Sequence, residues 1–524
     1  MKMHKKPAER MSASYFDSEA VLDNTPFEAT PSQKVALRVI DDYINLVDDE
    51  RSNFVEHAYR TADLVHVFAG GHMPSKAVDA VLLHDLGDRA TGGDMQKIKF
   101  ASAAFVDYLT SPEVNEEDSD YVVSLISDMT MIEDTATQYR ELDEPRLHLK
   151  GDDPDIWSKQ TPQIPLDEMF NLSKNVNIES IIIKSCEMLD NLHHPAKTNI
   201  SVMHDIFEAE SFYAPICEVL GYDGLAMELR SYAKQIRWSN LGYEDLLLNT
   251  KHFCYEMRRL GPESVFDKYA DKQDYSIYRV INQPLFIDKD SEVPYETVDL
   301  GEFALDLKGR LLSGNWRIKS VGSLADKIIS SKSKVNSEYV PMDVMGTTII
   351  SEDQSTVAED FADMVRHTVN SDGLQPHKAL SKDKPFYIQG DKKYIDKVLE
   401  QVACQMGEDF AKNQVETKTC VGGYRVSKFT CLGEDNMPIE MQFVTKEDRR
   451  AGRVGEWAHI FHKQKSSGVE YSEEELAMYA SQLEQIYERK RHMDAEDGEF
   501  MINPRSHVRG RRTKQNLYAR YGIS

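Results

Sequence analysis

Three short segments of this chain carry side chains that can bind a divalent metal and activate water. His57 opens a helical stretch, and the pair His84-Asp85 ends an apolar run. Glu187 and Asn191 end a third segment, which is also apolar. Two imidazoles and two carboxylates on buried helices are suited to a divalent cation, which lowers the pKa of a bound water.

The spacing of these residues supports a shared site. Adjacent His84 and Asp85 can bind one metal if they lie at a helix end. Glu187 and Asn191 are four positions apart and share one helix face, which Asp190 also reaches. The chain has 16 histidines, so a single His-Asp pair says little, and a buried histidine with a local hydrogen bond is the commoner case.

The order of the segments resembles the RelA/SpoT family, which makes and destroys the alarmone (p)ppGpp. The family's HD hydrolase domain carries His, then His-Asp, then an Ala-Asp-Arg-Leu-x-Asn-like helix, which Cys186–Leu192 resembles. Tyr213–Gly221 is similar to the family's next segment, Tyr-Ala-Pro-Leu-Ala-His-Arg-Leu-Gly. The resemblance implies an HD domain whose Mn²⁺ is bound by His57, His84, Asp85 and Glu187.

This chain departs from the family pattern near the same site. Glu187 replaces the usual Asp, which keeps the charge but lengthens the arm by one methylene. Where the family has two acids after His-Asp, this chain has Asp88 and Arg89. By resemblance, Asp88 is the general base or orients the water, and Asn191 is a second catalytic residue. Arg51 resembles a basic residue near the substrate's base, at a shorter spacing.

A second series of matches, to the family's synthetase domain, lies between residues 314 and 463. Gly314–Lys327 resembles the run Gly-Arg-x-Lys-x-x-x-Ser-x-x-x-Lys, and Asp343 begins a segment like the metal-binding strand. Gly422–Lys428 is similar to Asn-Gly-Tyr-x-Ser-Leu-His, and Ile439–Thr445 to Val-Glu-x-Gln-Ile-Arg-Thr. Gly455–His459 resembles Gly-x-Ala-Ala-His.

The chemistry of pyrophosphoryl transfer fits these residue types. A donor triphosphate needs cations, and Mg²⁺ is held by few carboxylates while phosphates complete its shell. The resemblance implies that Asp343 and Glu440 bind Mg²⁺ and that Glu440 also takes the proton of the acceptor 3'-hydroxyl. It implies substrate contacts from Arg317, Lys319, Lys327, Tyr424, Gln442 and His459.

Simpler interpretations remain open for the second series. Arg317, Lys319 and Lys327 also fit the solvated face of a helix. Glu440 and Gln442 alternate along a strand and share a face that is also explained by solvent exposure alone. Thr348 and Lys428 stand where the family has Arg and His.

Composition limits the class of protein. A chain of 524 residues should hold about three units at ~100–200 residues each. The net charge of −26 argues against general coating of nucleic acids or anionic membranes, but not against a local basic pocket. None of the six cysteines forms a CxxC pair, and no apolar stretch approaches the roughly 18 residues of a membrane span. We therefore expect a cytoplasmic protein with reduced thiols.

The pattern along the chain predicts a multidomain α + α/β fold. The polar stretch 133–165 indicates a long inserted loop, and 263–297 indicates a linker. Only about 60 residues follow Lys465, too few for the family's usual C-terminal regulatory domains. We predict a flexible N-terminus (1–30), an all-helical HD hydrolase domain (31–200), a helical connector and linker (201–297), a mixed-sheet nucleotidyltransferase-like synthetase domain (298–465) and a C-terminal helix with a basic tail (466–524).

Taken together, these features predict an enzyme of alarmone metabolism. The HD domain would hydrolyse (p)ppGpp with Mn²⁺, and the synthetase domain would transfer pyrophosphate from ATP to GDP or GTP with Mg²⁺. Its partners would be guanosine nucleotides, (p)ppGpp and ATP, with no membrane, no nucleic acid apart from the basic tail, and a homo-oligomer possible. Two alternatives remain: one active half with the other degenerate and regulatory, or a non-catalytic nucleotide sensor that acts through its basic tail.

Overall fold

The computed structural model describes most of the chain between Thr30 and Tyr518. The predicted flexible N-terminus, except Thr30, lies outside the described residues. Those described are residues 30–47, 51–69, 75–91, 95–148, 164–195, 199–260, 275–281, 300–307, 310–332, 344–370, 375–377, 384–420, 424–432, 438–455, 458, 460–461, 471–495, 508, 511–512, 514–516 and 518.

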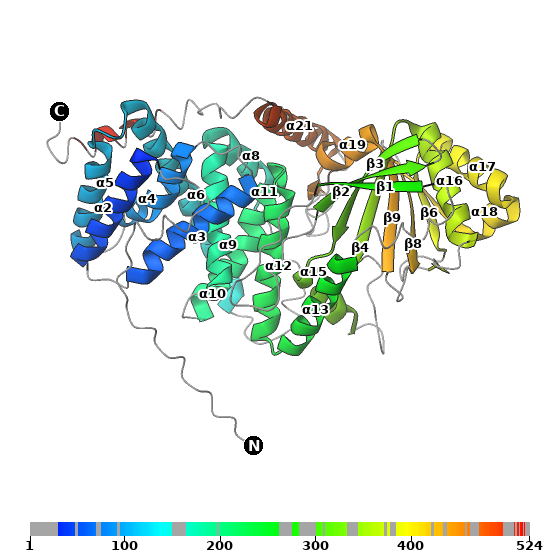
Figure 1. Cartoon of the computed structure of the whole chain (residues 1–524), viewed down its shortest axis with the longest axis horizontal. Helices are drawn as coiled ribbons and strands as arrows, with labels where there is room; N and C mark the ends of the chain where they lie inside the picture. Colours follow the sequence, from blue (N-terminus) through cyan, green and yellow to red (C-terminus); the bar gives the residue numbers. More distant parts are fainter. Residues whose placement is uncertain are drawn as a thin grey trace, which may run out of the picture. The chain divides into compact units, whose positions relative to one another are not determined.

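The chain divides into two compact units that alternate along the sequence. The first comprises Met1–Thr135, Asn171–Asp190 and Met493–Ser524, and the second comprises Ala136–Phe170 and Asn191–His492. A mostly helical region runs from Pro31 to Leu260, and a mixed sheet with helices follows it (Figure 1). The multidomain α + α/β class predicted from the sequence is confirmed at this level.

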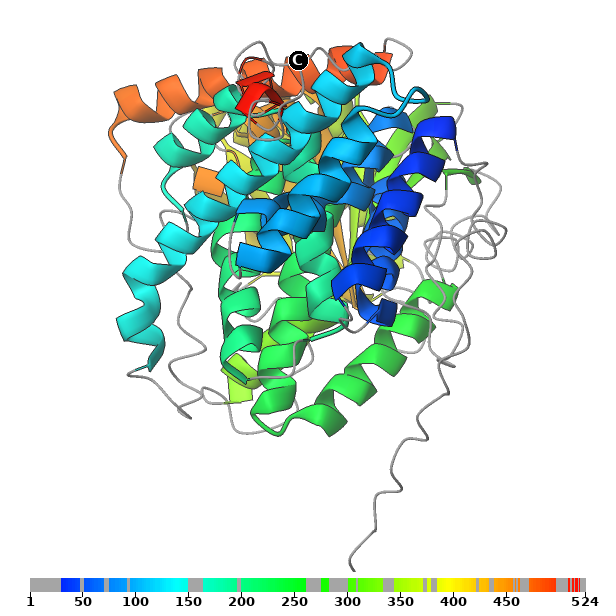
Figure 2. The ribbon, with the colours of Figure 1, turned by 90° about the vertical axis from the view of Figure 1, so that its left-hand side faces the viewer.

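The first unit is built from helices, which Figure 2 shows in blue to cyan for α2 to α6. Helix α4 packs against α2, α3 and α5. The helices that contribute to this unit are α2 (Pro31–Val47), α3 (Arg51–Ala69), α4 (Ser75–Thr91), α5 (Met95–Leu109), and parts of α6 (Glu116–His148), α8 (Leu166–Asn175) and α9 (Ile178–His193).

Local sequence signals explain two features of this bundle, the start of α2 and the burial of α9. Helix α2 begins with a capping box, in which Thr30 Oγ1 accepts from the Gln33 backbone N–H at 3.3 Å. The Gln33 side chain in turn accepts from the Thr30 N–H at 2.9 Å. Helix α9 is buried on every side near its start, where Ile181–Ile183 and the polar Ser180 and Ser185 are all inaccessible. It is therefore a core helix, and it also carries Glu187.

The predicted loop at 133–165 is wrong over its first half. Helix α6 continues without a break to His148, and residues 149–163 lie outside the described part of the chain. Charged residues in this stretch do not prevent a helix, because Glu, Lys, Arg and Gln are good helix formers when one face packs. Ile132 and Ala136 are buried and supply that face.

In the second unit, a series of helices precedes the sheet. Helices α10, η1 and α11 follow one another without a break, with Pro215 directly after the π-helical turn, and Gly221 closes the turn after α11 at φ 77°. These elements are α10 (Asn199–Glu208), the π-helix η1 (Ala209–Tyr213), α11 (Ala214–Val219), α12 (Asp223–Asn240) and α13 (Glu244–Leu260).

The sheet has nine strands in the described residues and mixes parallel and antiparallel pairs. Its order is β1-β2-β3-β4-β9-β8-β6-β7, with β5 also paired to β8. The β4–β9 and β6–β7 pairs are parallel. The strands are β1 (Tyr275–Ile281), β2 (Leu300–Leu307), β3 (Arg310–Ile318), β4 (Met345–Ser351), β5 (Gln375–Pro376), β6 (Phe386–Gly390), β7 (Val415–Thr419), β8 (Val426–Leu432) and β9 (Pro438–Thr445).

One face of this sheet is covered by helices and is apolar. Helix α16 (Gln354–Asn370) packs on β4, β8 and β9, and α17 (Lys392–Met406) packs on β6 and β7 (Figure 1). The ring of Phe361 from α16 lies 5.6 Å from that of Phe443 and 6.2 Å from that of Phe429, centroid to centroid. The remaining helices of the domain are α15 (Val321–Lys332), α18 (Glu408–Gln414) and α19 (Lys446–Val454).

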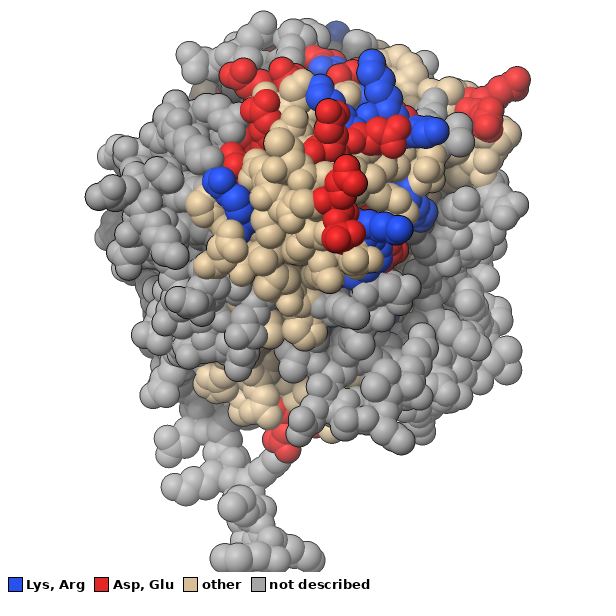
Figure 3. All heavy atoms as spheres, turned by 90° about the vertical axis from the view of Figure 1, so that its right-hand side faces the viewer, with Lys and Arg blue, Asp and Glu red and all other residues tan. Residues whose placement is uncertain are grey.

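The opposite face of the central strands carries the polar residues. In β4 and β9 buried residues alternate with half-exposed ones, and the half-exposed set includes Glu440 and Gln442. A different surface, the side at the right of Figure 1, faces the viewer in Figure 3. Acidic and basic side chains are interspersed on it, so its described residues form no patch of one sign.

Two sequence interpretations of this domain need correction. The predicted linker 263–297 contains strand β1, which pairs antiparallel with β2. Arg317 lies near the end of strand β3, and Lys319 directly follows that strand, so neither belongs to a solvated helix face. Lys327 does lie on a helix, α15.

The C-terminal residues form a helix and a docked segment. Helix α21 (Glu473–Ala495) confirms the predicted C-terminal helix, and its Tyr479 stacks on Phe170 at 5.6 Å. In the basic tail, Lys514 is buried, with its Nζ 2.7 Å from Ser119 Oγ and 2.8 Å from Asp120 Oδ1. Part of the tail's positive charge is therefore bound to the chain itself.

None of the helices in the described part of the chain is long and apolar enough to cross a membrane.

Candidate metal centre and polar sheet face

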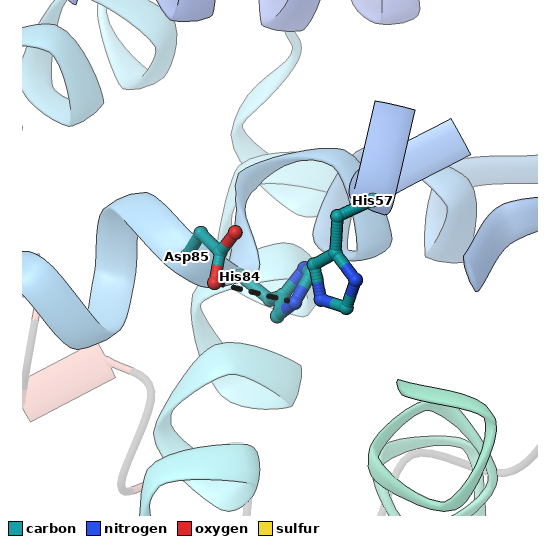
Figure 4. Close-up of side chains that lie close together, drawn as sticks. All are labelled: His57, His84 and Asp85. Atoms are coloured by element: carbon teal, nitrogen blue, oxygen red, sulfur yellow. Dashed lines mark ion pairs between the residues drawn. The ribbon is translucent and has the colours of Figure 1, made fainter. Parts of the chain in front are cut away.

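His57, His84 and Asp85 lie together in the first unit although two helices supply them. Helix α3 carries His57, and α4 carries the adjacent pair (Figure 4). The two imidazole centroids are 5.5 Å apart, and one ligand atom from each of the three residues lies within 4.8 Å of the others. Asp85 and Glu187 both approach His84 Nε2, Asp85 Oδ1 at 3.6 Å and Glu187 Oε2 at 3.4 Å.

The backbone fixes the tautomer of His84. Its Nδ1 lies 2.5 Å from the carbonyl oxygen of Val81, and a carbonyl can only accept, so Nδ1 carries the proton. Nε2 faces the carboxylates of Asp85 and Glu187. The side chain is 1% exposed, and the described residues offer Nε2 no hydrogen-bond partner. A buried nitrogen lone pair without a partner is costly unless a cation or water satisfies it.

A carboxylate orients His57 in the same manner. His57 Nδ1 donates to Asp190 Oδ2 at 2.6 Å, which leaves Nε2 available as a ligand. Arg60 grips the same carboxylate through Nε at 2.7 Å and a second guanidinium nitrogen at 3.0 Å. Such a carboxylate–histidine pair is the usual support of an imidazole that binds metal.

The charges around His57 change its proton affinity. Burial alone lowers the pKa of His57, but the hydrogen bond to Asp190 and the negative charges of Asp85, Glu187 and Asp190 outweigh it. The net result is a raised pKa. The same acidic surroundings that stabilise a proton on this imidazole favour a divalent cation between the ligands.

Glu187 reaches the centre from α9 and is held by a lysine. Lys184 Nζ lies 2.9 Å from Glu187 Oε1 and 2.8 Å from Oε2. The same ammonium contacts Glu133 Oε2 of α6 at 3.0 Å.

The donor set and its spacing fit a divalent metal. Two imidazole nitrogens and two carboxylates match borderline cations such as Mn²⁺ or Zn²⁺. Bonds of about 2.1 Å place ligand atoms at most about 4.2 Å apart, so side-chain shifts of roughly half an ångström would bring the three ligand atoms of His57, His84 and Asp85, within 4.8 Å of one another, around an ion. The orphaned Nε2 of His84 is the atom that most requires such a partner.

The other residues predicted for this site are only partly located. Asp88 lies in α4, one turn after His84, and Arg51 is the first residue of α3, but the side chains of both lie outside the described part. Asn191 is half-buried in α9, one turn after Glu187.

The second predicted site maps onto the open face of the sheet. Arg317 of β3 pairs with Gly346 of β4, and Gly346 pairs with Glu440 of β9. The Arg317 side chain lies against Gly346, where a Cβ would be 3.4 Å from Nε. Gln442, two residues further along β9, donates to Glu440 Oε2 at 2.8 Å.

On this face of the sheet a lysine contacts the carboxylate of Glu440. Lys428 of β8 places Nζ 2.9 Å from Glu440 Oε1. Tyr424 precedes the same strand and rests on α19, where a Cβ on Gly452 would come within 2.8 Å of its ring. Burial, followed by the charges of Asp448 and Glu440, raises the pKa of Tyr424.

Not every predicted residue of the second site can be assessed. Asp343 and His459 lie outside the described residues, so the predicted meeting of Asp343 with Glu440 stays a prediction. Arg317 is exposed, while Lys319 and Lys327 are half-buried.

Sequence reasoning missed two neighbours of the centre and gave a third a different place. Asp190 was expected near the metal and instead supports His57, while Arg60 and Lys184 were not singled out. Arg60 stands three positions after His57, and Lys184 stands three positions before Glu187, so each shares a helix face with a proposed ligand. That spacing was the available signal.

A scan against protein-family models and a search of curated proteins each found no match to this chain.

Proposed function

We propose that this protein hydrolyses (p)ppGpp to GDP or GTP and pyrophosphate at a metal centre made by His57, His84, Asp85 and Glu187. The observation that carries the proposal is the buried Nε2 of His84, which faces two carboxylates and has no hydrogen-bond partner among the described residues. The helical region would then be an HD-type hydrolase domain, as the resemblance to the RelA/SpoT family implies.

Each residue has a role that its contacts support. Val81 and Asp190 hold the two imidazoles in the tautomers that present Nε2. Asp85 and Glu187 supply the negative charge that binds a cation beside them. Bound there, Mn²⁺ would supply an acidified water and neutralise phosphate charge.

Proton transfer and substrate orientation are assigned to residues that match the RelA/SpoT family pattern. Asp88, one helical turn after His84, is the candidate to take the proton of the attacking water. Asn191 and Arg51 are the candidates for orienting the substrate. A 3'-pyrophosphate ester is inert and anionic, so its hydrolysis needs this combination of charge neutralisation and a positioned base.

For the sheet domain we propose pyrophosphoryl transfer from ATP to GDP or GTP. The alignment of Arg317, Gly346 and Glu440 in one cross-strand row supports it, because a cation and a carboxylate face the same open surface. With Mg²⁺ shared between Asp343 and Glu440, Arg317, Lys319 and Lys327 would hold the triphosphate. Gln442, Tyr424 and His459 complete the proposed substrate site.

One observation favours a single-activity alternative. The Lys428–Glu440 ion pair already satisfies the carboxylate that a Mg²⁺ ion would use. On this alternative the sheet domain binds nucleotides and regulates the hydrolase. The sensor alternative loses support, because Lys514 and Arg511 of the basic tail both pair with Asp120.

Two incubations test these proposals. Purified protein is given ppGpp with Mn²⁺, and separately labelled ATP with GDP or GTP and Mg²⁺, and the products are resolved. Release of pyrophosphate from ppGpp is expected in the first, and transfer in the second. His252→Ala, at an exposed histidine of α13, serves as the control that should retain full activity. Intact ppGpp after the first incubation would contradict the hydrolase.

A further inference from the structure

Lys184 is a buried lysine, with a side chain 4% exposed, in contact with a proposed metal ligand. Its Nζ lies within 2.9 Å of both oxygens of Glu187 and 3.0 Å from Glu133 Oε2. Lysine is almost never fully buried unless it is paired, so this position requires its two carboxylates. The contacts join α9 to α6 immediately beside the centre.

We propose that Lys184 is a positioning residue that fixes the carboxylate of Glu187 in the orientation required for metal binding. The inference rests on the proposed metal centre. The ammonium donates a hydrogen bond to Oε1, which holds the carboxylate in place. Oε2 has no hydrogen-bond partner among the described residues and lies 3.4 Å from His84 Nε2, so it is the oxygen left for a metal.

The length of Glu187 explains why such a residue is needed. A glutamate has one more rotatable bond than an aspartate, so more side-chain entropy is lost when its carboxylate is held at one point. Lys184 lies one turn earlier on the same helix, and its own far end is fixed by Glu133. The ligand is therefore held before the metal arrives, which lowers the entropy lost on binding.

Glu133 offsets the positive charge that Lys184 places beside the proposed metal ligand. An isolated ammonium beside a metal ligand would repel the metal and weaken its binding. Here the charge of Lys184 is offset by Glu133, so the pair adds close to zero net charge to the centre. Glu133 is 48% exposed, and solvent screens its side of the pair.

A charge-neutral double variant separates positioning from electrostatics. Lys184→Met with Glu133→Gln removes one positive and one negative charge, so the net charge around the centre is unchanged while Glu187 loses its support. We expect Mn²⁺ to bind this variant about ten-fold more weakly than the parent, the lower end for residues that support a metal ligand. Glu133→Gln alone keeps Lys184 in place and should weaken binding only about three-fold, through charge.

The measurement is calorimetric titration of metal-free, full-length protein with Mn²⁺, with circular dichroism as the check on folding. If the Met-containing variant does not fold, Lys184→Gln with Glu133→Gln is used, and at least three-fold weaker binding is expected. Equal or tighter Mn²⁺ binding by the folded double variant overturns the inference alone. Failure of the parent to bind Mn²⁺ overturns the proposed metal centre, and the inference with it.

Discussion

In both the helical metal centre and the polar sheet face, a lysine contacts the carboxylate on which the proposed chemistry depends. Lys184 lies 2.8 Å from Glu187, and Lys428 lies 2.9 Å from Glu440. The surroundings differ. Lys184 also pairs with Glu133, whereas Glu440 is the one carboxylate that pairs with Lys428 among the described residues.

The difference bears on whether each carboxylate is ready for a metal. At the helical centre the lysine's charge is offset by Glu133, and the buried Nε2 of His84 and Oε2 of Glu187 have no hydrogen-bond partner among the described residues. At the sheet face Glu440 accepts from both Lys428 and Gln442, so its oxygens are satisfied without an ion. A carboxylate alone does not indicate a metal site, since its neighbours determine whether its negative charge is already paired with a cation.

The largest expected effect is at the helical centre. His84→Ala removes the buried nitrogen and should lower Mn²⁺-dependent ppGpp hydrolysis by at least about 10³-fold, because loss of a ligand displaces the ion. Product release is measured by chromatography of labelled nucleotide. The folded variant should keep the parental circular dichroism, and parental hydrolysis by it would show that the site is misassigned.

The next prediction tests the sheet face. Glu440→Gln keeps the side chain's shape but removes its charge and its capacity as a base, so it should lower pyrophosphoryl transfer by about 10²–10⁴-fold. Hydrolysis of ppGpp by the same preparation should be unchanged and serves as the internal control. If the parent transfers no pyrophosphate from ATP to any guanosine or adenosine acceptor, the single-activity alternative holds.

A smaller effect is expected at Asp190, which contacts the proposed ligand His57 but is not itself a proposed ligand. Asp190→Asn leaves Arg60 and His57 with a neutral partner, so His57 loses the carboxylate that orients its ring. Mn²⁺ affinity, measured by titration, should fall about ten-fold or more. Asp167→Asn, which changes a carboxylate outside the centre, is the matched control. Unchanged affinity in Asp190→Asn would mean that His57 needs no such support.

The smallest expected effect tests whether Lys428 differs from Lys184 in its effect on metal binding. Lys428→Met removes the ammonium that competes for Glu440, so Mg²⁺ should bind a few-fold more tightly at the sheet face. The gain is small because Lys428 and Glu440 are both partly exposed and their attraction is screened. Weaker Mg²⁺ binding in this variant would show instead that Lys428 positions Glu440 in the way we infer for Lys184.

Several features followed from local sequence alone. The helical first half, the strands β4, β8 and β9, and the C-terminal helix were predicted because apolar periodicity and β-branched runs are local signals. The strand at Tyr275–Ile281 and the end of α6 were not, because neighbouring elements outweigh weak propensities in polar segments.

For the candidate site, the sequence predicted the residue types, and the tertiary structure determined which residues support them. The types of His57, His84, Asp85 and Glu187, together with their order, were sufficient to predict a metal centre. The pairing of His57 with Asp190 spans 133 positions, and that of Lys184 with Glu133 spans 51. Periodicity reports which face of a helix is buried, but not which distant helix packs against it, so only the packing of α3, α6 and α9 could decide which carboxylates orient the ligands.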